Sequence, residues 1–169
     1  MSTRELVALF HHRWAPPALV VLAERGAGRF VEIQRTLGAG SNSLRHALDA
    51  LLELGYVRRN PGYGHPLRPE YLVTDSGRVV GATCARVLET ADPDVLLRKW
   101  SVPTLAQLDE PRRFSELRSG LGSVTSRALA LALQDLEGAR LVEREVLATR
   151  PPSTVYRATG KGRRVAQLV

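Results

Sequence analysis

Cysteine, aromatic residues and long apolar runs are all scarce in this sequence. Cys84 is the single cysteine in 169 residues. This excludes an internal disulfide and a cysteine-rich zinc site, and it favours a reducing, cytoplasmic location. No apolar run approaches the roughly 20 residues that a membrane-spanning helix needs, and the first ten residues lack a cleavable signal pattern. We therefore expect a cytoplasmic protein without a membrane partner.

Aromatic residues make up only 5% of the sequence, although the apolar fraction of 44% is ordinary for a globular protein. A chain of this apolar content is not expected to be disordered. Its core must consist mainly of leucine, valine and alanine side chains, which favours small helical layers over a large sheet sandwich. The length allows one ordinary domain or two small ones.

Lysine is also scarce, because only Lys99 and Lys161 are lysines among 24 basic residues, while the formal net charge is +7. The planar arginine fork suits phosphate groups and guanine edges, which indicates a polyanionic partner. A GC-rich genome would produce the same arginine bias through codon usage. The charge agrees with nucleic-acid binding without establishing it.

An internal repeat is the most informative feature of the chain. A basic residue followed by tryptophan begins each copy, and the later matches keep the same order at an offset of 84 to 86 residues. The matched segments are 13–14 with 99–100, 29–33 with 113–117, 44–51 with 129–136, 55–59 with 140–144, 71–74 with 156–159, and 77–78 with 162–163. Such an ordered series predicts two copies of one fold.

Within each copy, the apolar spacing predicts three helices followed by two strands. The first copy has predicted helices at 14–23, at 30–37 and from a cap at Ser41 or Asn42 to Gly55, and predicted strands at 56–59 and 70–74. The second copy has predicted helices at 102–108, 114–121 and 125–137, and strands near 141–146 and 154–159. A closing helix is expected at 75–88, followed by a short break at 90–93, in which Asp92 is the expected cap and Pro93 the first helical position.

Three helices followed by a two-stranded hairpin form a winged helix-turn-helix. The predicted fold class is therefore mainly α with small β-hairpins (α+β), built as a tandem duplicated winged helix-turn-helix. The expected domains are residues 1–89, which include the closing helix, and residues 90–169. The joint between them contains no long Gly/Ser tether.

Both copies resemble the HxlR-type winged-helix transcriptional regulators, the second copy more closely. The resemblance covers residues 94–169 and, more loosely, 6–85, and it rests on the Lys99-Trp100 pair, the segment 111–117 and the segment 150–162. Members of this family usually carry one unit per chain and bind DNA as homodimers. The resemblance thus implies a single-chain pseudodimer, acting as a monomer or pairing again as a homodimer. Some members sense through an N-terminal cysteine that this sequence lacks, so thiol sensing is not expected unless Cys84 has that role.

In this fold the third helix enters the major groove of double-stranded DNA, and the wing contacts phosphate or minor groove. Asparagine and arginine bond adenine and guanine edges, and serine bonds phosphate. An ordinary solvated helix face and a purely structural hairpin are the alternatives. The candidate DNA-contacting residues of the first copy are Asn42, Ser43, Arg45 and His46 in the helix and Arg58, Arg59 and Arg68 in the wing.

The second copy offers fewer groups for contacting bases. Its candidates are Ser126 and Arg127 in the helix and Arg144 and Arg150 in the wing, but residues 128–133 form an unbroken apolar run. We therefore predict a sequence-specific transcriptional regulator that represses by occluding a promoter. The first copy is expected to make most base contacts, and the second to position the chain on the duplex.

The apolar run also favours a second hypothesis. The second copy, or the region between the copies, would then bind a small hydrophobic effector or another protein, and the chain would have lost its operator. Trp14, Trp100 and Leu131 are the candidate residues of such a ligand pocket. The alternative for both tryptophans is a role as core anchors.

Catalytic and metal-binding patterns are missing from the sequence. His11 and His12 are adjacent, so on a helix they would point about 100° apart, which is poor geometry for shared metal ligation. The segment 26–29 follows a helix and not a strand, so it is not a phosphate-binding loop. We expect no enzyme activity, no cofactor and no metal.

Overall fold

The computed structural model describes residues 1–60, 70–148 and 153–169. The chain forms two compact units, and each has its own core. The first unit is His11–Arg86, and the second unit combines Met1–Phe10 with Val87–Val169. This division differs from the expected domains 1–89 and 90–169 because it assigns the first ten residues to the unit that contains the second copy.

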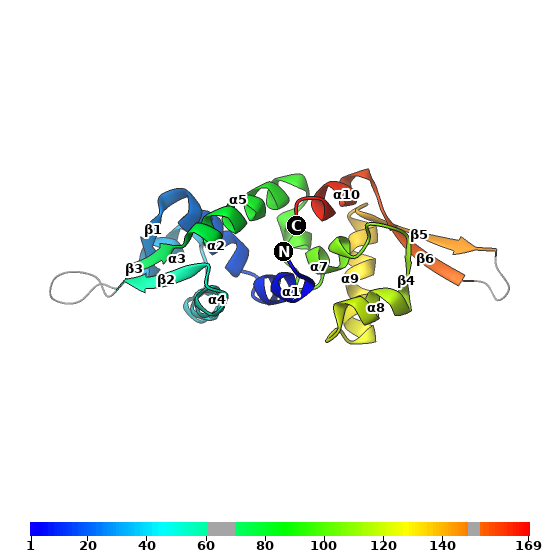
Figure 1. The fold of residues 1–169 in the computed structure, drawn as a ribbon, viewed down its shortest axis with the longest axis horizontal. Helices are drawn as coiled ribbons and strands as arrows, with labels where there is room; N and C mark the ends of the chain where they lie inside the picture. Colours follow the sequence, from blue (N-terminus) through cyan, green and yellow to red (C-terminus); the bar gives the residue numbers. More distant parts are fainter. Residues whose placement is uncertain (61–69, 149–152) are drawn as a thin grey trace. The chain divides into compact units, whose positions relative to one another are not determined.

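The first unit contains one complete winged helix-turn-helix (Figure 1). The third helix and the hairpin follow each other as the sequence pattern predicts, and the first unit ends inside its closing helix. Its elements are α2 (Ala15–Arg25), β1 (Ala27–Arg29), α3 (Phe30–Leu37), α4 (Ser41–Glu53), β2 (Val57–Asn60), β3 (Glu70–Val73) and most of α5 (Asp75–Thr90).

The second unit repeats this order and adds the N-terminal helix α1 (Thr3–His11). The amide Nε2 of Gln107 donates a hydrogen bond to the Thr3 hydroxyl at 2.9 Å, and the Met1 amino group donates to the carbonyl of Val169 at 2.9 Å. The other elements are α6 (Pro93–Leu96), α7 (Ser101–Ala106), β4 (Arg112–Arg113), α8 (Phe114–Leu121), α9 (Ser126–Gly138), β5 (Val142–Leu147), β6 (Ser153–Ala158) and α10 (Gly160–Ala166).

Each unit has a three-stranded antiparallel sheet where the sequence predicted a two-stranded hairpin. The strand orders are β1-β3-β2 and β4-β6-β5. The added strand pairs Gly28 with Tyr71 in the first unit and Arg112 with Tyr156 in the second. The predicted hairpin was incomplete because strands of three and two residues are too short to show an alternating apolar pattern.

The core of each unit lies beneath its third helix. Leu44, Leu48 and Leu51 of α4 are fully buried, and the corresponding leucines of α9, Leu129, Leu133 and Leu136, are at most 2% exposed. Burying one leucine side chain contributes roughly 1.5–3 kcal/mol. The leucine spacing predicts a buried stripe of Leu44, Leu48, Leu51 and Leu52 in the first copy; three of these are confirmed, and Leu52 is only half-buried. This packing sets which face of α4 and α9 meets solvent.

The helix starts follow local capping chemistry, with one difference from expectation. The backbone N–H of Arg29 donates to the Glu32 carboxylate at 2.9 Å, and that of Arg113 donates to Glu116 at 2.6 Å. These bonds explain why an Arg-Phe-x-Glu pattern begins α3 and α8. The cap of α4 is Gly40, which has no side chain to accept a bond, so the expected cap at Ser41 or Asn42 is wrong.

No single helix in the described part of the chain is long and apolar enough to cross a membrane. Only α1 and α2, taken together across the break at residues 12–14, have the required length and composition. Leu6, Leu9 and Phe10 of α1 and Leu19 and Leu22 of α2 are buried in the protein, which accounts for that apolar composition.

A threonine and a glycine close each wing onto the helix that follows it. The Thr74 hydroxyl donates to the Gly55 carbonyl at 2.8 Å and accepts from the Gly77 amide at 3.0 Å. Thr159 forms the same pair of bonds, to Arg140 at 2.9 Å and from Gly162 at 3.1 Å. This arrangement explains the repeated Thr-x-x-Gly spacing. It places Gly77 against the Tyr56 carbonyl and Gly162 against the Leu141 carbonyl, which leaves no room for a side chain.

Substituting alanine at Gly77 or Gly162 should destabilise the protein. A Cβ would overlap the carbonyl oxygen of Tyr56 at Gly77 and that of Leu141 at Gly162. Overpacking of this kind costs about 1–3 kcal/mol. Urea unfolding followed by circular dichroism measures the effect. Gly138→Ala is the control because no atom lies within 4 Å of its added Cβ, and unchanged stability in both test variants would contradict the geometry.

The second residue after each third helix has a left-handed backbone, and this residue differs between the two copies. Gly55 has a φ of 71°, and Arg140, which occupies the matching place in the second copy, has a φ of 56°. Glycine adopts this conformation without steric cost, whereas arginine does not. The second unit therefore carries a local strain that the first unit avoids.

Arg140→Gly should stabilise the second unit by up to about 1 kcal/mol, since the strain at a left-handed residue exceeds the entropy cost of glycine. Gly55→Arg is the reciprocal variant and should destabilise the first unit by a similar amount. Thermal unfolding of both variants beside the parent protein measures these shifts. A lower unfolding temperature for Arg140→Gly would show that the arginine side chain contributes contacts that outweigh the strain.

Candidate nucleic-acid interface

The turn before α4 fixes how this helix is presented. Gly38 adopts the left-handed conformation that ends α3, with a φ of 64°. The amide Nε2 of Gln34 then donates to the Ala39 carbonyl at 3.2 Å and to the Ser41 hydroxyl at 2.8 Å. One side chain of α3 thus connects to both the turn and the first residue of α4.

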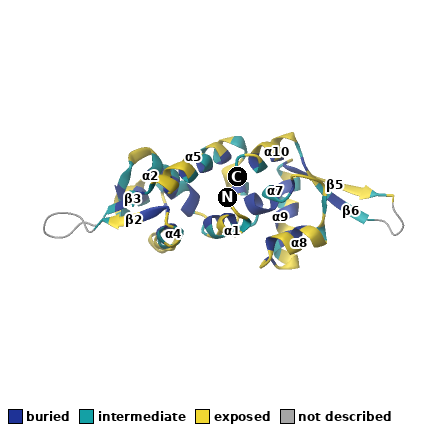
Figure 2. Ribbon diagram, viewed as in Figure 1, coloured by how far each residue is buried: buried dark blue, intermediate teal, exposed yellow. Residues whose placement is uncertain are grey.

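The solvent face of α4 is polar at every fully exposed position between residues 41 and 46. Asn42, Ser43, Arg45 and His46 are all exposed. Figure 2 shows exposed residues on α4. Gly40 caps the helix without a side-chain hydrogen bond. This end of α4 therefore offers amide, hydroxyl, guanidinium and imidazole groups in one place, the groups that bond base edges and phosphates. Their contact with DNA remains a prediction.

The wing strand of the first unit is basic. Arg58 and Arg59 of β2 are both exposed. Arg59 is held by its own unit, because its Nη2 lies 3.2 Å from the Asp49 carboxylate and its guanidinium lies 5.7 Å from the centre of the Tyr71 ring. The ion pair of Arg59 with Asp49 thus connects the wing to α4. Arg68 lies outside the described residues.

The third helix of the second unit has the same length and register but different chemistry. Both α4 and α9 contain 13 residues, and the repeat places Arg127 at the position of Asn42, Ala130 at that of Arg45 and Leu131 at that of His46. Ser126, Arg127 and Ala130 are exposed, and Leu131 is 52% exposed. Beyond its first turn, α9 therefore presents apolar side chains where α4 presents an arginine and a histidine.

The second wing strand also differs in charge. Arg144 of β5 is exposed, but Glu143 and Glu145 beside it are exposed as well. Glu145 forms an ion pair with Arg157 of β6, with 3.1 Å between the carboxylate and Nη2. The position of Arg58 is thus occupied by Glu143 in the second copy, which reduces the positive charge available for phosphate contact. Arg150 lies outside the described residues.

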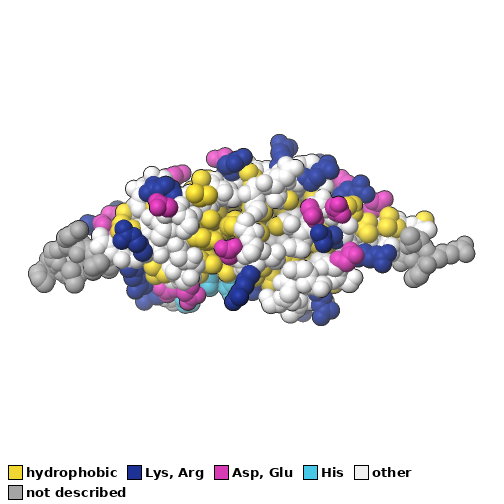
Figure 3. Space-filling view, in the orientation of Figure 1, with side chains coloured by type: hydrophobic (Ala, Val, Ile, Leu, Met, Phe, Trp, Pro, Cys, Tyr) yellow, Lys and Arg dark blue, Asp and Glu magenta, His cyan; other side chains and the backbone are white. Residues whose placement is uncertain are grey.

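On the face drawn in Figure 3, arginine and lysine side chains alternate with acidic ones and do not form one continuous basic surface. On this face the basic side chains therefore occur in small groups. The positions of the basic side chains on α4 and its wing therefore say more about DNA binding than the total net charge does.

Two cavities lie among the described residues of the second unit, and the predicted ligand-pocket residues line neither of them. Trp14 and Trp100 are half-buried caps of α2 and α7, and the Lys99 ammonium lies 4.9 Å from the centre of the Trp100 ring. One cavity of about 340 Å³ is bounded by α1 and by residues 120–123, and another of about 620 Å³ by α6, α9 and Lys161. Neither includes Trp14, Trp100 or Leu131.

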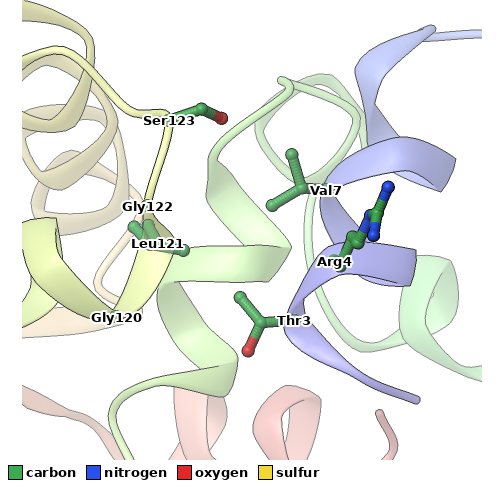
Figure 4. A pocket seen from close by; sticks show the side chains of 7 residues that line it. All are labelled: Thr3, Arg4, Val7, Gly120, Leu121, Gly122 and Ser123. Carbon is green, nitrogen blue, oxygen red and sulfur yellow. The ribbon is translucent and has the colours of Figure 1, made fainter.

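The smaller cavity offers little for specific binding. In Figure 4, Val7 and Thr3 of α1 project towards the loop of Gly122 and Ser123, while the Arg4 side chain turns away. Gln107 already donates to the Thr3 hydroxyl. The Arg4 guanidinium on the rim of the cavity is therefore not directed into it. A pocket for an effector stays a prediction.

The histidines near α4 do not form a metal site. The His11 and His12 rings lie 4.7 Å apart, and the His12 ring lies 6.1 Å from that of His46. Among residues 1–60, 70–148 and 153–169, no group of three or more His, Cys, Asp or Glu side chains is placed to hold a metal ion.

The two copies of the internal repeat match known proteins separately. The sequence model of HxlR-like helix-turn-helix proteins matches residues 9–92 and again 95–169. The HTH-type transcriptional regulator YodB of Bacillus subtilis is 32% identical over 84 residues, which cover 49% of this chain and 74% of YodB. The structure of reduced YodB covers 44% of this chain and 74% of its own, at 30% identity and a TM-score of 0.42.

Two further relatives match over shorter shares of their length. YybR of Bacillus subtilis, an uncharacterized HTH-type transcriptional regulator, is 36% identical over 77 residues, which are 45% of this chain and 62% of YybR. A regulator of Methanothermobacter thermautotrophicus is 35% identical over 72 residues, 42% of this chain and 55% of its own length. The chain thus spans just over half the length of these two relatives, and each match covers about one copy of the repeat.

Cys84 should react very slowly with thiol reagents while the protein is folded. The side chain is 1% exposed on α5, and burial raises the pKa of its thiol to about 12. The reactive thiolate is therefore absent near pH 8, where an exposed cysteine with a pKa of about 8.5 is partly ionised. Iodoacetamide labelling followed by mass spectrometry, with and without concentrated urea, measures the difference.

The same raised pKa predicts a loss of stability at alkaline pH. The contribution of the buried neutral thiol is complete below pH ~8.5, where the unfolded thiol is protonated, and declines as the pH rises towards about 12. Cys84→Ala removes this dependence and serves as the control. Rapid stoichiometric labelling of the folded protein would contradict the burial of Cys84.

Proposed function

Because this chain belongs to the HxlR-like helix-turn-helix family, we propose that it is a sequence-specific DNA-binding transcriptional regulator. The observation that carries the proposal is the exposed polar face of α4, where Asn42, Ser43, Arg45 and His46 lie on a helix fixed by the Gln34 hydrogen bonds. Third helices of this fold enter the major groove with their N-terminal residues leading. The relatives YodB and YybR bear the name of HTH-type transcriptional regulators.

The two units are proposed to contribute unequally to binding. The first unit makes most base contacts, because arginine and asparagine can each form two hydrogen bonds to guanine or adenine edges. Arg58 and Arg59 of its wing contact phosphate. In the second unit, Ser126, Arg127 and Arg144 hold the chain on the duplex, and the acidic neighbours of Arg144 weaken its attraction to phosphate.

A single chain supplies both winged units, so we propose that it occupies two half-sites as a monomeric pseudodimer. Binding across a promoter would exclude RNA polymerase, which makes repression the simplest consequence. Acting on chromosomal DNA places the protein in the cytoplasm. No catalytic step enters this function, since recognition and occlusion need only binding.

One alternative function is favoured by a specific observation. Leu131 of α9 is 52% exposed at the position where α4 carries His46. A module that binds a small hydrophobic effector or another protein, and that has lost its operator, would also expose an apolar residue there. Failure to prefer any DNA sequence would favour this alternative.

Arg45→Ala should lower the preference for the cognate sequence over a scrambled duplex by roughly tenfold or more, because it removes a bidentate base contact. Arg127→Ala should weaken binding to both duplexes alike and reduce the salt dependence of binding by about one phosphate contact. Fluorescence anisotropy with DNA from upstream of the gene, repeated at several salt concentrations, measures both effects.

Arg78→Ala is the control for this experiment, because it removes an exposed arginine from α5 without changing α4 or α9. If Arg127→Ala alone abolished sequence preference, the proposed roles of the two units would be reversed. Equal and weak binding of the parent protein to both duplexes would overturn the proposal of a sequence-specific regulator.

A further inference from the structure

The exposed face of α9 combines one cation with an apolar surface. Arg127, Ala130, Leu131 and Gln134 follow the spacing i, i+3, i+4 and i+7, so they share one side of the helix, and all four are exposed. Arg127 is the only charged residue among them. In α4 the same four positions hold Asn42, Arg45, His46 and Asp49.

We propose that Ala130 and Leu131 are specificity-determining residues that contact thymine methyl groups in one half of an asymmetric operator. This inference rests on the proposed function and deepens it, because it assigns to α9 a discriminating role of its own. The occupant of the apolar face is then the major groove of a half-site that contains thymines.

The chemistry of the major groove supports this occupant. The C5-methyl group of thymine is the apolar feature that a base pair presents there, and alanine and other apolar side chains recognise it by contact. A G·C pair at the same place would put polar base atoms against Leu131 without a hydrogen-bond partner, which is unfavourable. The face can therefore discriminate between base pairs without forming a hydrogen bond.

The position of these residues within the helix favours DNA over other occupants. The N-terminal turn of α9 is capped by the Thr125 hydroxyl, which accepts from the Ala128 amide at 3.2 Å, and it exposes Ser126 and Arg127. These groups suit phosphate, and Ala130 and Leu131 come one turn later, where α4 carries its base-contacting candidates. The two cavities described above do not include Ala130 or Leu131.

The consequence is an operator without twofold symmetry. The half-site of the first unit contains guanine or adenine contacted by Arg45 and Asn42, and the half-site of the second unit contains thymines. A homodimer with identical helices would instead select a palindrome.

The test starts with selection of binding sites by the full chain from a random duplex library. The selected duplex is then synthesised with deoxyuridine in place of thymidine in one half at a time, which removes only the methyl groups. The affinities are measured by fluorescence anisotropy for the parent protein and for Leu131→Ser. The control variant is Val79→Ser, which changes an apolar residue that is 69% exposed on α5.

The expected result is a non-palindromic site in which deoxyuridine lowers affinity in one half only, by about fourfold for each contacted methyl group. Leu131→Ser should reduce that effect by the share of the methyl contacts that Leu131 makes, leaving those of Ala130, and Val79→Ser should leave it unchanged. Arg45→Ala should impair recognition of the other half.

Four results would overturn the inference. A palindromic selected site, or a site indifferent to deoxyuridine, would do so while leaving the proposed function intact. Unchanged deoxyuridine sensitivity in Leu131→Ser would also leave DNA binding intact but would assign the methyl contacts to other residues. Failure to select any sequence would overturn both the inference and the proposed function.

Discussion

Burial of the leucine stripe of the third helix is the constraint on which both units depend. Leu44, Leu48 and Leu51 of α4 face the core, and each contributes roughly 1.5–3 kcal/mol by leaving water. A rotation of the helix that exposed them would cost a large share of the stability of a small domain. The outward face is consequently fixed by the inward one, and side chains such as Arg45 point to solvent because leucines on the opposite side cannot.

The same constraint explains how the two copies can differ in surface chemistry without differing in fold. The buried leucines recur in α9, and the glutamate bonds of Glu32 and Glu116 begin the second helix in both units. None of these contacts involves the residues at 42, 45 and 46 or their counterparts. The presence of Ala130 in place of Arg45 and of Leu131 in place of His46 therefore changes what the surface can bind without changing the packing.

The sequence predicted those parts of the fold that depend on local periodicity. Helix 30–37 was placed with its observed bounds, and the buried positions of both third helices followed from the spacing of leucine. Two features depend on contacts distant in sequence and were missed. Strands β1 and β4 form by pairing with β3 and β6, and residues 1–10 belong to the second unit although they precede the first. The two strands are too short to leave a periodic signal, and the apolar spacing of Leu6, Leu9 and Phe10 in α1 indicates a helix without indicating which unit it packs in.

The candidate interface was predicted to a different extent in each element. Exposure of Asn42 and Arg45 followed directly from the leucine stripe, since residues between buried positions must face outward. The fixing of Arg59 by Asp49 and Tyr71 did not, because it joins β2 to α4 and to β3 across the unit. The cap at Gly40 was missed because Ser41 and Asn42 are the usual caps, whereas here the Ser41 hydroxyl accepts from Gln34.

Fusion of two units into one chain gives this asymmetry a physical meaning. In a homodimer one substitution changes both half-sites, so a polar group introduced for one half is repeated in the other. In this chain α4 and α9 change independently. The first unit combines arginines of the wing with polar groups of α4, so in the proposed function its attraction to DNA is largely ionic and sensitive to salt. The second unit has Glu143 where the first has Arg58 and Leu131 where it has His46, so its proposed contribution depends more on close apolar contact, which salt screens much less.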